Sequence, residues 1–166
     1  MTTPLSYTIR PAVATDEPFL MEMLYQSLFV EEGQEPFQRD VLQDTSIARY
    51  VRGWGRKGDF GFVTIDTSSR QPVGAVWCRL WSGDDSGFAY LDAETPELGI
   101  ALLPEYRGQG IGTALLEHLL AAAKDRYPAL SLSVSPNNPA VRLYERHGFQ
   151  VVEVRGTQLV MAVRFE

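Results

Sequence analysis

The stretch LLPEYRGQGIGTALLEHLL, residues 102 to 120, places three glycines within five positions, directly before a leucine-rich helical pattern. Glycine inside a helix costs roughly 1 kcal/mol relative to alanine, so Gly108, Gly110 and Gly112 need a physical reason. A strand end, a glycine-rich turn and a helix start gather backbone N–H groups and the positive end of a helix dipole at one point. The stretch therefore predicts an anion-binding turn, where Arg107 can add a charged contact to a phosphate.

Two common phosphate-binding motifs do not fit this turn. A P-loop needs Gly-Lys followed by Ser or Thr, and no such pair occurs in the chain. The dinucleotide motif Gly-x-Gly-x-x-Gly fails because position 113 is threonine, and no acidic residue closes the next strand. A nucleotide-binding α/β domain is thereby disfavoured.

Hydrophobic periodicity predicts a mixed α/β fold around the turn. An apolar run over residues 97–103 predicts a strand before it, and a helix to about Tyr127 and a strand near 129–135 complete one βαβ unit. Elsewhere the pattern predicts a strand at 5–11, helices at 15–30 and from 39 to near Gly53, strands at 60–66 and 72–81, a helix at 138–147 and strands at 149–156 and 158–166.

Composition limits the class of protein. The chain has 166 residues and a net charge of -6, which argues against nucleic acid as its main partner. Cys78 is the one cysteine, so no intramolecular disulfide can form, and no Cys/His cluster has the spacing of a metal site. The N-terminus lacks the pattern of a signal peptide, and no apolar run is long enough to span a membrane. We expect a cytoplasmic protein without a bound metal.

The glycine turn resembles the pyrophosphate-binding signature of the GNAT superfamily of N-acetyltransferases, Arg/Gln-x-x-Gly-x-Gly/Ala, through Arg107, Gly110 and Gly112. Downstream, NNPAVRLYERHGF resembles that superfamily's Asn-x-x-Ala-x-x-Leu-Tyr-x-x-x-Gly-Phe segment. The matching positions there are Asn137, Ala140, Leu143, Tyr144, Gly148 and Phe149. The resemblance covers most of the chain, is most specific over 97–149 and is weakest over 31–95.

The resemblance implies a fold and a binding site for acetyl-CoA. The fold would be a single α/β (α+β) domain of residues 1–166, with about four helices and a mostly antiparallel sheet of about seven strands, splayed between the fourth and fifth strands to admit coenzyme A. The pyrophosphate would lie on the backbone of Arg107, Gly108, Gln109, Gly110, Ile111, Gly112 and Thr113. The pantetheine arm would pair with Ile100, Ala101, Leu102 and Leu103, and Asn137 would hydrogen-bond to it.

Two residues are candidates for the proton transfers of acetylation. Tyr144 matches the superfamily's usual proton donor to the departing thiolate, and a phenol is still protonated at neutral pH. Its alternative is a tyrosine packed in the core. Glu97 stands where many members carry a glutamate that accepts the proton of the amine, directly or through water; its alternative is an exposed carboxylate at a strand end. Asn137 has an alternative role as a helix cap, for which Asn138 competes.

Other polar residues are weaker candidates. His118 and His147 lie on predicted helices and are more typical of surface or cap positions than of a base. Cys78 lies in a strand and is more typical of packing than of acyl transfer. Some members that acetylate protein N-termini carry a glutamate in the fifth strand, five residues before the asparagine; that position is Leu132, which counts against this subgroup.

The acceptor side is the least defined by sequence. Acidic residues gather in two segments flanking the expected cleft and could attract a cationic amine, or could be ordinary solvated loops. They are Glu31, Glu32, Glu35, Asp40 and Asp44 in one segment and Asp84, Asp85, Asp92, Glu94 and Glu97 in the other. Aromatic residues could line an acceptor pocket or pack in the core; they are Trp54, Trp77, Trp81, Phe88 and Tyr90.

The sequence thus predicts an N-acetyltransferase that acetylates a primary amine of a small molecule by direct attack in a ternary complex with acetyl-CoA. A protein lysine or N-terminal amine is an alternative acceptor, and a homodimer is possible. A non-catalytic module that senses acyl-CoA is the rival from another class; the presence of Tyr144 disfavours it.

Overall fold

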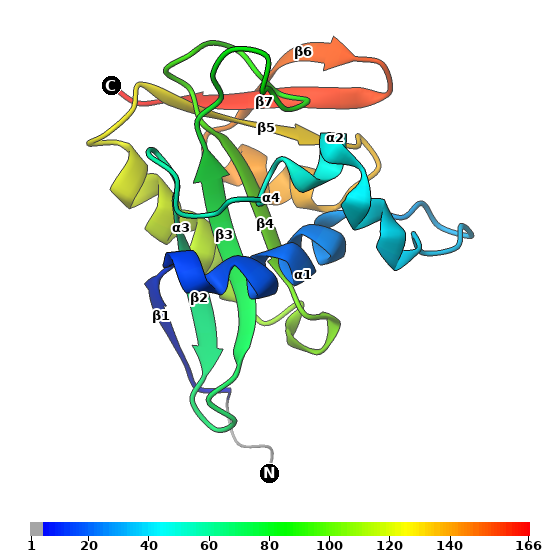
Figure 1. The fold of residues 1–166 in the computed structure, drawn as a ribbon, viewed down its shortest axis with the longest axis vertical. Coiled ribbons are helices and arrows are strands. Elements are labelled where there is room, and N and C mark those ends of the chain that lie inside the picture. The colour runs from blue at the N-terminus through cyan, green and yellow to red at the C-terminus, as the bar shows by residue number, and fades with distance from the viewer. Residues whose placement is uncertain (1–4) are drawn as a thin grey trace.

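One mixed sheet of seven strands, in the order β1-β2-β3-β4-β5-β7-β6, organises the protein in a computed structural model that describes residues 5–166 (Figure 1). The strands are β1 (Tyr7–Pro11), β2 (Phe60–Asp66), β3 (Pro72–Arg79), β4 (Glu97–Leu102), β5 (Ala129–Val134), β6 (Gln150–Arg155) and β7 (Gln158–Arg164). Neighbouring strands are antiparallel except β4 and β5, which are parallel. The expected mostly antiparallel sheet is confirmed.

Helices cover both faces of this sheet. They are α1 (Glu17–Ser27), α2 (Thr45–Ala48), α3 (Ile111–Ala123) and α4 (Ala140–Arg146), with short 3-10 turns η1 (Ala14–Asp16), η2 (Arg39–Gln43) and η3 (Pro104–Tyr106). On one face, α1 contributes Leu20, Met23 and Leu24 to a hydrophobic cluster with Trp77 of β3. On the other face, the leucines of α3 and Tyr144 of α4 pack in a second cluster. The two clusters give a three-layer arrangement.

Strand β3 lies in the middle of these layers, which explains its nearly continuous apolar sequence. Successive side chains alternate between the faces. Val76 and Cys78 pack in the cluster beneath α3, whereas Ala75 and Trp77 pack in the cluster beneath α1. Opposite Trp77 on β4 stands Gly99, where an added Cβ would lie 2.6 Å from an atom of the indole ring. Gly99 is therefore needed so that the indole ring of Trp77 can pack against β4.

The sheet opens between β4 and β5. These strands are in register only at Glu97 and Ser131, and Figure 1 shows β5 turning away from the direction of β4. The edge of β4 that faces β5 consequently has no strand partner beyond Glu97 within residues 5–166. This is the splayed geometry that the resemblance implies.

One predicted element is wrong. The pattern over residues 39–54 predicts one helix, but the structure has the 3-10 turn η2, the single helical turn α2 and then non-helical turns. The reason is that the side chain of Arg79 in strand β3 takes up backbone carbonyls of this segment. The carbonyls of Arg49, Val51 and Arg52 accept hydrogen bonds from Arg79 of β3. The helix predicted over 15–30 also ends earlier, at Ser27, because Leu28 has extended backbone with ψ of 112°.

Candidate active site

The glycine turn before α3 is open on its outer side. Gly108 and Gly110 have φ of 76° and 85°, the left-handed region that side chains rarely adopt. No atom lies within 4 Å of where a Cβ would stand on either residue, so conformation rather than crowding requires glycine there. Gly110 is the N-cap of α3 and supplies no side-chain cap, which leaves the first N–H groups of the helix to an external acceptor. The turn therefore fits an anion.

Arg107 lies beside this turn with loosely held donors. Its Nε donates to the carbonyl of Leu102 at 3.3 Å, and its Nη2 donates to Oε1 of Gln26 on α1 at 3.3 Å. The side chain is exposed, and long, exposed hydrogen bonds of this kind can be exchanged for a phosphate oxygen. Gln109 bonds within the turn, where its Nε2 donates to the carbonyl of Glu105 at 3.1 Å.

Two cavities meet at the opening of the sheet. One, which we call the turn cavity, has a volume of about 610 Å³ and is lined by Ile100 to Leu102, Arg107 and Gly112. The other, which we call the glutamate cavity, has a volume of about 590 Å³ and is lined by Glu31 and Glu97. The residues that line both are Ser27, Leu28, Phe29, Phe37, Ile100, Asn138 and Tyr144. A long ligand in the first cavity can thus reach a smaller one in the second.

Tyr144 stands where the two cavities join. It belongs to α4, packs edge-on against Phe149 at 5.8 Å and is 7 % exposed. Burial raises the pKa of its phenol to about 12. The phenol therefore keeps its proton at neutral pH and can donate it to a strong base formed beside it. Tyr144 is both a core residue and a lining residue, so the two alternatives for it are compatible.

Glu97 is buried rather than exposed at its strand end, with 2 % of its surface accessible. Its Oε1 accepts from Nε1 of Trp81 at 3.0 Å and from the amide of Ala89 at 3.1 Å. Its Oε2 accepts from the hydroxyl of Tyr50 at 2.5 Å. Burial raises the pKa of Glu97, and these three donors oppose that rise. The alternative of an exposed carboxylate at a strand end is therefore wrong.

Tyr50 is a site residue that sequence reasoning missed. Its hydroxyl donates to Glu97 and accepts from the amide of Phe88 at 2.7 Å, and its ring lines the glutamate cavity. Burial and the nearby Glu97 hold its pKa well above the usual range. Gly87 leaves room for this contact, since a Cβ there would lie 2.4 Å from Oε1 of Glu97 and 2.5 Å from the Tyr50 hydroxyl.

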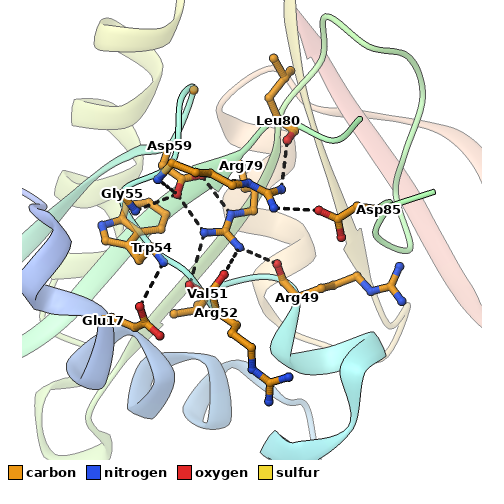
Figure 2. Close-up of polar contacts among 12 residues, drawn as sticks. Glu17, Arg49, Val51, Arg52, Trp54, Gly55, Asp59, Arg79, Leu80 and Asp85 are labelled. Atoms are coloured by element: carbon orange, nitrogen blue, oxygen red, sulfur yellow. Dashed lines mark hydrogen bonds and ion pairs between the residues drawn. The ribbon is translucent and has the colours of Figure 1, made fainter. Parts of the chain in front are cut away.

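A buried ion pair fixes the backbone that carries Tyr50 (Figure 2). Arg79 and Asp59 are joined by two hydrogen bonds, of 3.0 and 2.8 Å, and the side chain of each is 1 % exposed. The remaining donors of Arg79 bond to the carbonyls of Arg49, Val51 and Arg52, at 2.8, 3.3 and 2.7 Å respectively. All five guanidinium N–H groups are therefore used, and two of the carbonyls flank Tyr50 in the chain.

The two asparagines before α4 have different partners. Oδ1 of Asn138 accepts from the backbone amide of Ala140, the first residue of α4, at 2.9 Å, and Asn138 lines both cavities. Asn137 is exposed and lines neither cavity; its Nδ2 donates to the carboxylate of Glu31 at 3.2 and 3.3 Å. The N-cap of α4 is Pro139, so the cap alternative for Asn137 is wrong, and a hydrogen bond from Asn137 to pantetheine stays a prediction.

The remaining candidates divide between core and cavity. Trp54 and Trp81 pack in the cluster beneath α1, Trp77 packs there and lines the glutamate cavity, and half-exposed Phe88 lines it too. Cys78 is fully buried on the opposite face, where burial raises the pKa of its thiol. The described residues, 5–166, contain no group of acidic, histidine or cysteine side chains that could hold a metal ion. No helix among them is long and apolar enough to cross a membrane.

Comparison with known proteins identifies the family. The profile of the Acetyltransferase (GNAT) family matches residues 19–149 of the chain. The protein belongs to this family. GNAT relatives include an N-alpha-acetyltransferase of Sulfurisphaera tokodaii, 46% identical over 61 residues, which are 34% of this chain and 36% of the relative. An uncharacterized N-acetyltransferase of Methanocaldococcus jannaschii is 29% identical over 153 residues, 90% of this chain and 63% of the relative.

The GNAT fold is also found by structural comparison. The PaiA N-acetyltransferase of Thermoplasma acidophilum, whose crystal structure contains coenzyme A, superimposes with a TM-score of 0.68 and 20% sequence identity. The match covers 97% of this chain and 100% of that chain. The present chain spans less than two thirds of the length of either sequence relative named above. Family and fold are thus established, and the acceptor is not decided by these likenesses.

Proposed function

We propose that this GNAT protein transfers the acetyl group of acetyl-CoA to a primary amine, and that it binds both substrates at the junction of its two cavities. The observation that carries the proposal is that junction itself. Arg107 and Gly112 of the open glycine turn line one cavity, the buried carboxylate of Glu97 lines the other, and Tyr144 lines both. A carrier and an acceptor could therefore bind at the same time, as direct attack requires.

The turn cavity supports binding of coenzyme A. The N–H groups at the start of α3 and the side chain of Arg107 suit a pyrophosphate. The unpaired edge of β4 at Ile100 to Leu102 offers backbone groups to the amides of the pantetheine arm, as an added strand would. Leu103 is less suited to this pairing, because its N–H donates to the carbonyl of Val73 and its carbonyl accepts from the N–H of Tyr106. The coenzyme A complex of the Thermoplasma acidophilum neighbour supports the same use of the fold.

The reaction needs two proton transfers, one at each substrate. The amine nitrogen attacks the thioester carbonyl carbon, so an N–C bond forms and the C–S bond breaks. Glu97 accepts the proton that the amine loses, directly or through Tyr50 or water, because Oε2 accepts from Tyr50 alone. Tyr144 donates its proton to the departing thiolate of coenzyme A.

The acceptor in this proposal is an amine of a small molecule. The likeness to an N-alpha-acetyltransferase supports a protein N-terminus as the second candidate. Against it stands Leu132, which is 1 % exposed and occupies the position where such enzymes carry a glutamate. The rival without catalysis, an acyl-CoA sensor, would bind coenzyme A and release no thiol.

Coenzyme A is expected to stabilise the folded protein, whereas NAD and ATP are not. A ligand that binds only the native state at one hundred times its Kd adds about 2.7 kcal/mol to the free energy of unfolding. Thermal unfolding with each compound measures this, and thiol release from acetyl-CoA with a panel of amines measures transfer. Stabilisation without thiol release would support the sensor, and stabilisation by NAD alone would contradict the proposal.

The pH dependence should reveal Glu97. A base works only when ionised, and burial raises the pKa of Glu97 above the ordinary glutamate value of about 4.3. With acetyl-CoA saturating, kcat/KM should therefore fall on acidification with an inflection above pH ~4.3, in addition to the loss caused by protonation of the amine. The same profile for Glu97→Gln should lack this inflection. An unchanged inflection in the variant would assign the base to another group.

A further inference from the structure

The glutamate cavity has an unbalanced charge. Its lining includes two acidic residues, Glu31 and Glu97, and no lysine, arginine or histidine of the described residues lines it. Most of the remaining lining is apolar or aromatic, as at Phe29, Trp77 and Phe88. We propose that the acceptor, given the acetyl transfer proposed above, is a primary amine with a second cationic nitrogen at the far end of an apolar spacer, and that Glu31 selects it.

Glu31 is held in place for such a contact. Its Oε1 accepts from the buried hydroxyl of Ser135 at 3.3 Å, and the carboxylate accepts from Nδ2 of Asn137 at 3.2 and 3.3 Å. The backbone N–H of Asn137 in turn donates to Oγ of Ser135 at 3.3 Å. A carboxylate has about four acceptor positions, so these contacts orient Glu31 and leave acceptor capacity for a cation.

The two carboxylates of the glutamate cavity are anchored near different residues of β5 and the segment that follows it. Glu97 is paired with Ser131 at the start of the opening, whereas Glu31 is bonded to Ser135, the residue directly after the end of β5. A strand rises about 3.3 Å per residue, so the backbones at 131 and 135 are roughly 13 Å apart. Val134, Ile100 and Phe37 are among the apolar residues that line the cavity. That span suits two nitrogens separated by several methylene groups.

An anionic group on the acceptor would lack a partner here. Two arginines approach this region, but both are bonded to the loop that carries Phe88 and line neither cavity. Arg155 donates to the carbonyl of Phe88 at 3.0 Å and to Glu153 at 2.8 Å, and Arg49 donates to the carbonyl of Ser86 at 2.6 Å. A carboxylate taken out of water without a cation is strongly disfavoured, and Glu31 would repel it as well. Free amino acids should be poor acceptors.

Matched acceptors test the inference on the intact protein. With acetyl-CoA saturating, kcat/KM is measured for α,ω-diaminoalkanes from diaminopropane to diaminooctane and for the alkylamines of equal length. The best diamine should exceed its matched alkylamine by roughly tenfold, the size of one charge-assisted hydrogen bond. Lysine and diaminopentane differ by one carboxylate, and lysine should be the poorer acceptor by a similar factor.

Two variants at neighbouring positions distinguish a specific contact made by Glu31 from the general effect of removing one negative charge. Glu31→Gln should reduce the preference for the diamine over the alkylamine to near unity. Glu32→Gln removes the same charge from an exposed residue that lines neither cavity, and the preference should persist. The stabilisation of each variant by coenzyme A shows that it is folded and binds the carrier.

Each outcome decides between the proposals. Equal rates for diamine and alkylamine, a preference unaffected by Glu31→Gln, or a peptide N-terminus acetylated better than every diamine would overturn the diamine inference and leave amine acetylation standing. Loss of thiol release with every amine, despite binding of coenzyme A, would overturn the acetyltransferase proposal and the diamine inference together.

Discussion

Asp59→Asn should lower the free energy of unfolding by about 3–5 kcal/mol, because it leaves the buried charge of Arg79 without its carboxylate. Both side chains are 1 % exposed, so water cannot replace the lost partner. Burial is the reason that the effect is large, since an exposed ion pair contributes little. Urea-induced unfolding, followed by fluorescence of the three tryptophans, measures the change.

A matched control distinguishes burial from charge. Arg39 and Glu22 form an ion pair of similar length, 2.6 Å, in which the arginine side chain is 60% exposed. Glu22→Gln should therefore change stability only slightly. Equal losses in Asp59→Asn and Glu22→Gln would contradict the assignment of Arg79 and Asp59 as the stabilising pair.

Replacing both Arg79 and Asp59 with apolar residues should not restore the free energy of unfolding that is lost when Arg79 is replaced alone. Replacing a buried ion pair with apolar residues can be neutral when the pair bonds only to itself. Here the guanidinium also satisfies the carbonyls of Arg49, Val51 and Arg52. Those carbonyls would be left without that donor in Arg79→Met with Asp59→Leu. Because Arg49 and Val51 flank Tyr50, the double variant should also disturb the contact of Tyr50 with Glu97.

The same arginine shows why part of the fold could not be predicted. Strand β2 was predictable to the residue because a run of residues that favour strands lies next to a polar turn, which is local information. The segment from 39 to 54 has a weak helical period, and its conformation depends on Arg79, 27 to 30 positions away from the carbonyls it binds. Local propensity cannot reveal a partner at that separation.

The candidate site also has a part that the local sequence predicts and a part that depends on contacts between distant residues. The glycine turn was predictable because positive φ at Gly108 and Gly110 is a property of the residue type at that point in the chain. Tyr50 was not, since its hydroxyl meets Glu97 across 47 positions. The burial of Glu97 was also missed, because the loop that covers it bonds through Ala89 and Trp81, and no local pattern marks those contacts.

Tyr144→Phe should lower the rate of acetyl transfer about 10²- to 10³-fold and leave the affinity for acetyl-CoA nearly unchanged. The ring remains to pack against Phe149, so only the hydroxyl is lost. General acid catalysis contributes about 10²- to 10⁴-fold, and here the hydroxyl is the donor proposed for the thiolate. Single-turnover acetylation measures the chemical step even if product release limits kcat. Calorimetric titration with acetyl-CoA measures the affinity.

Tyr127→Phe supplies the control for a lost phenol. Its ring stacks on Phe60 at 5.7 Å, and it lines neither cavity, so transfer should proceed at the normal rate. A normal rate in Tyr144→Phe as well would reduce Tyr144 to a packing residue and make water the proton donor. A rate that falls together with the affinity would instead place the hydroxyl in binding of the carrier. Because burial holds the pKa of Tyr144 at about 12, the loss caused by Tyr144→Phe should be the same from neutral pH to pH ~10, where an unperturbed phenol would already have begun to ionise.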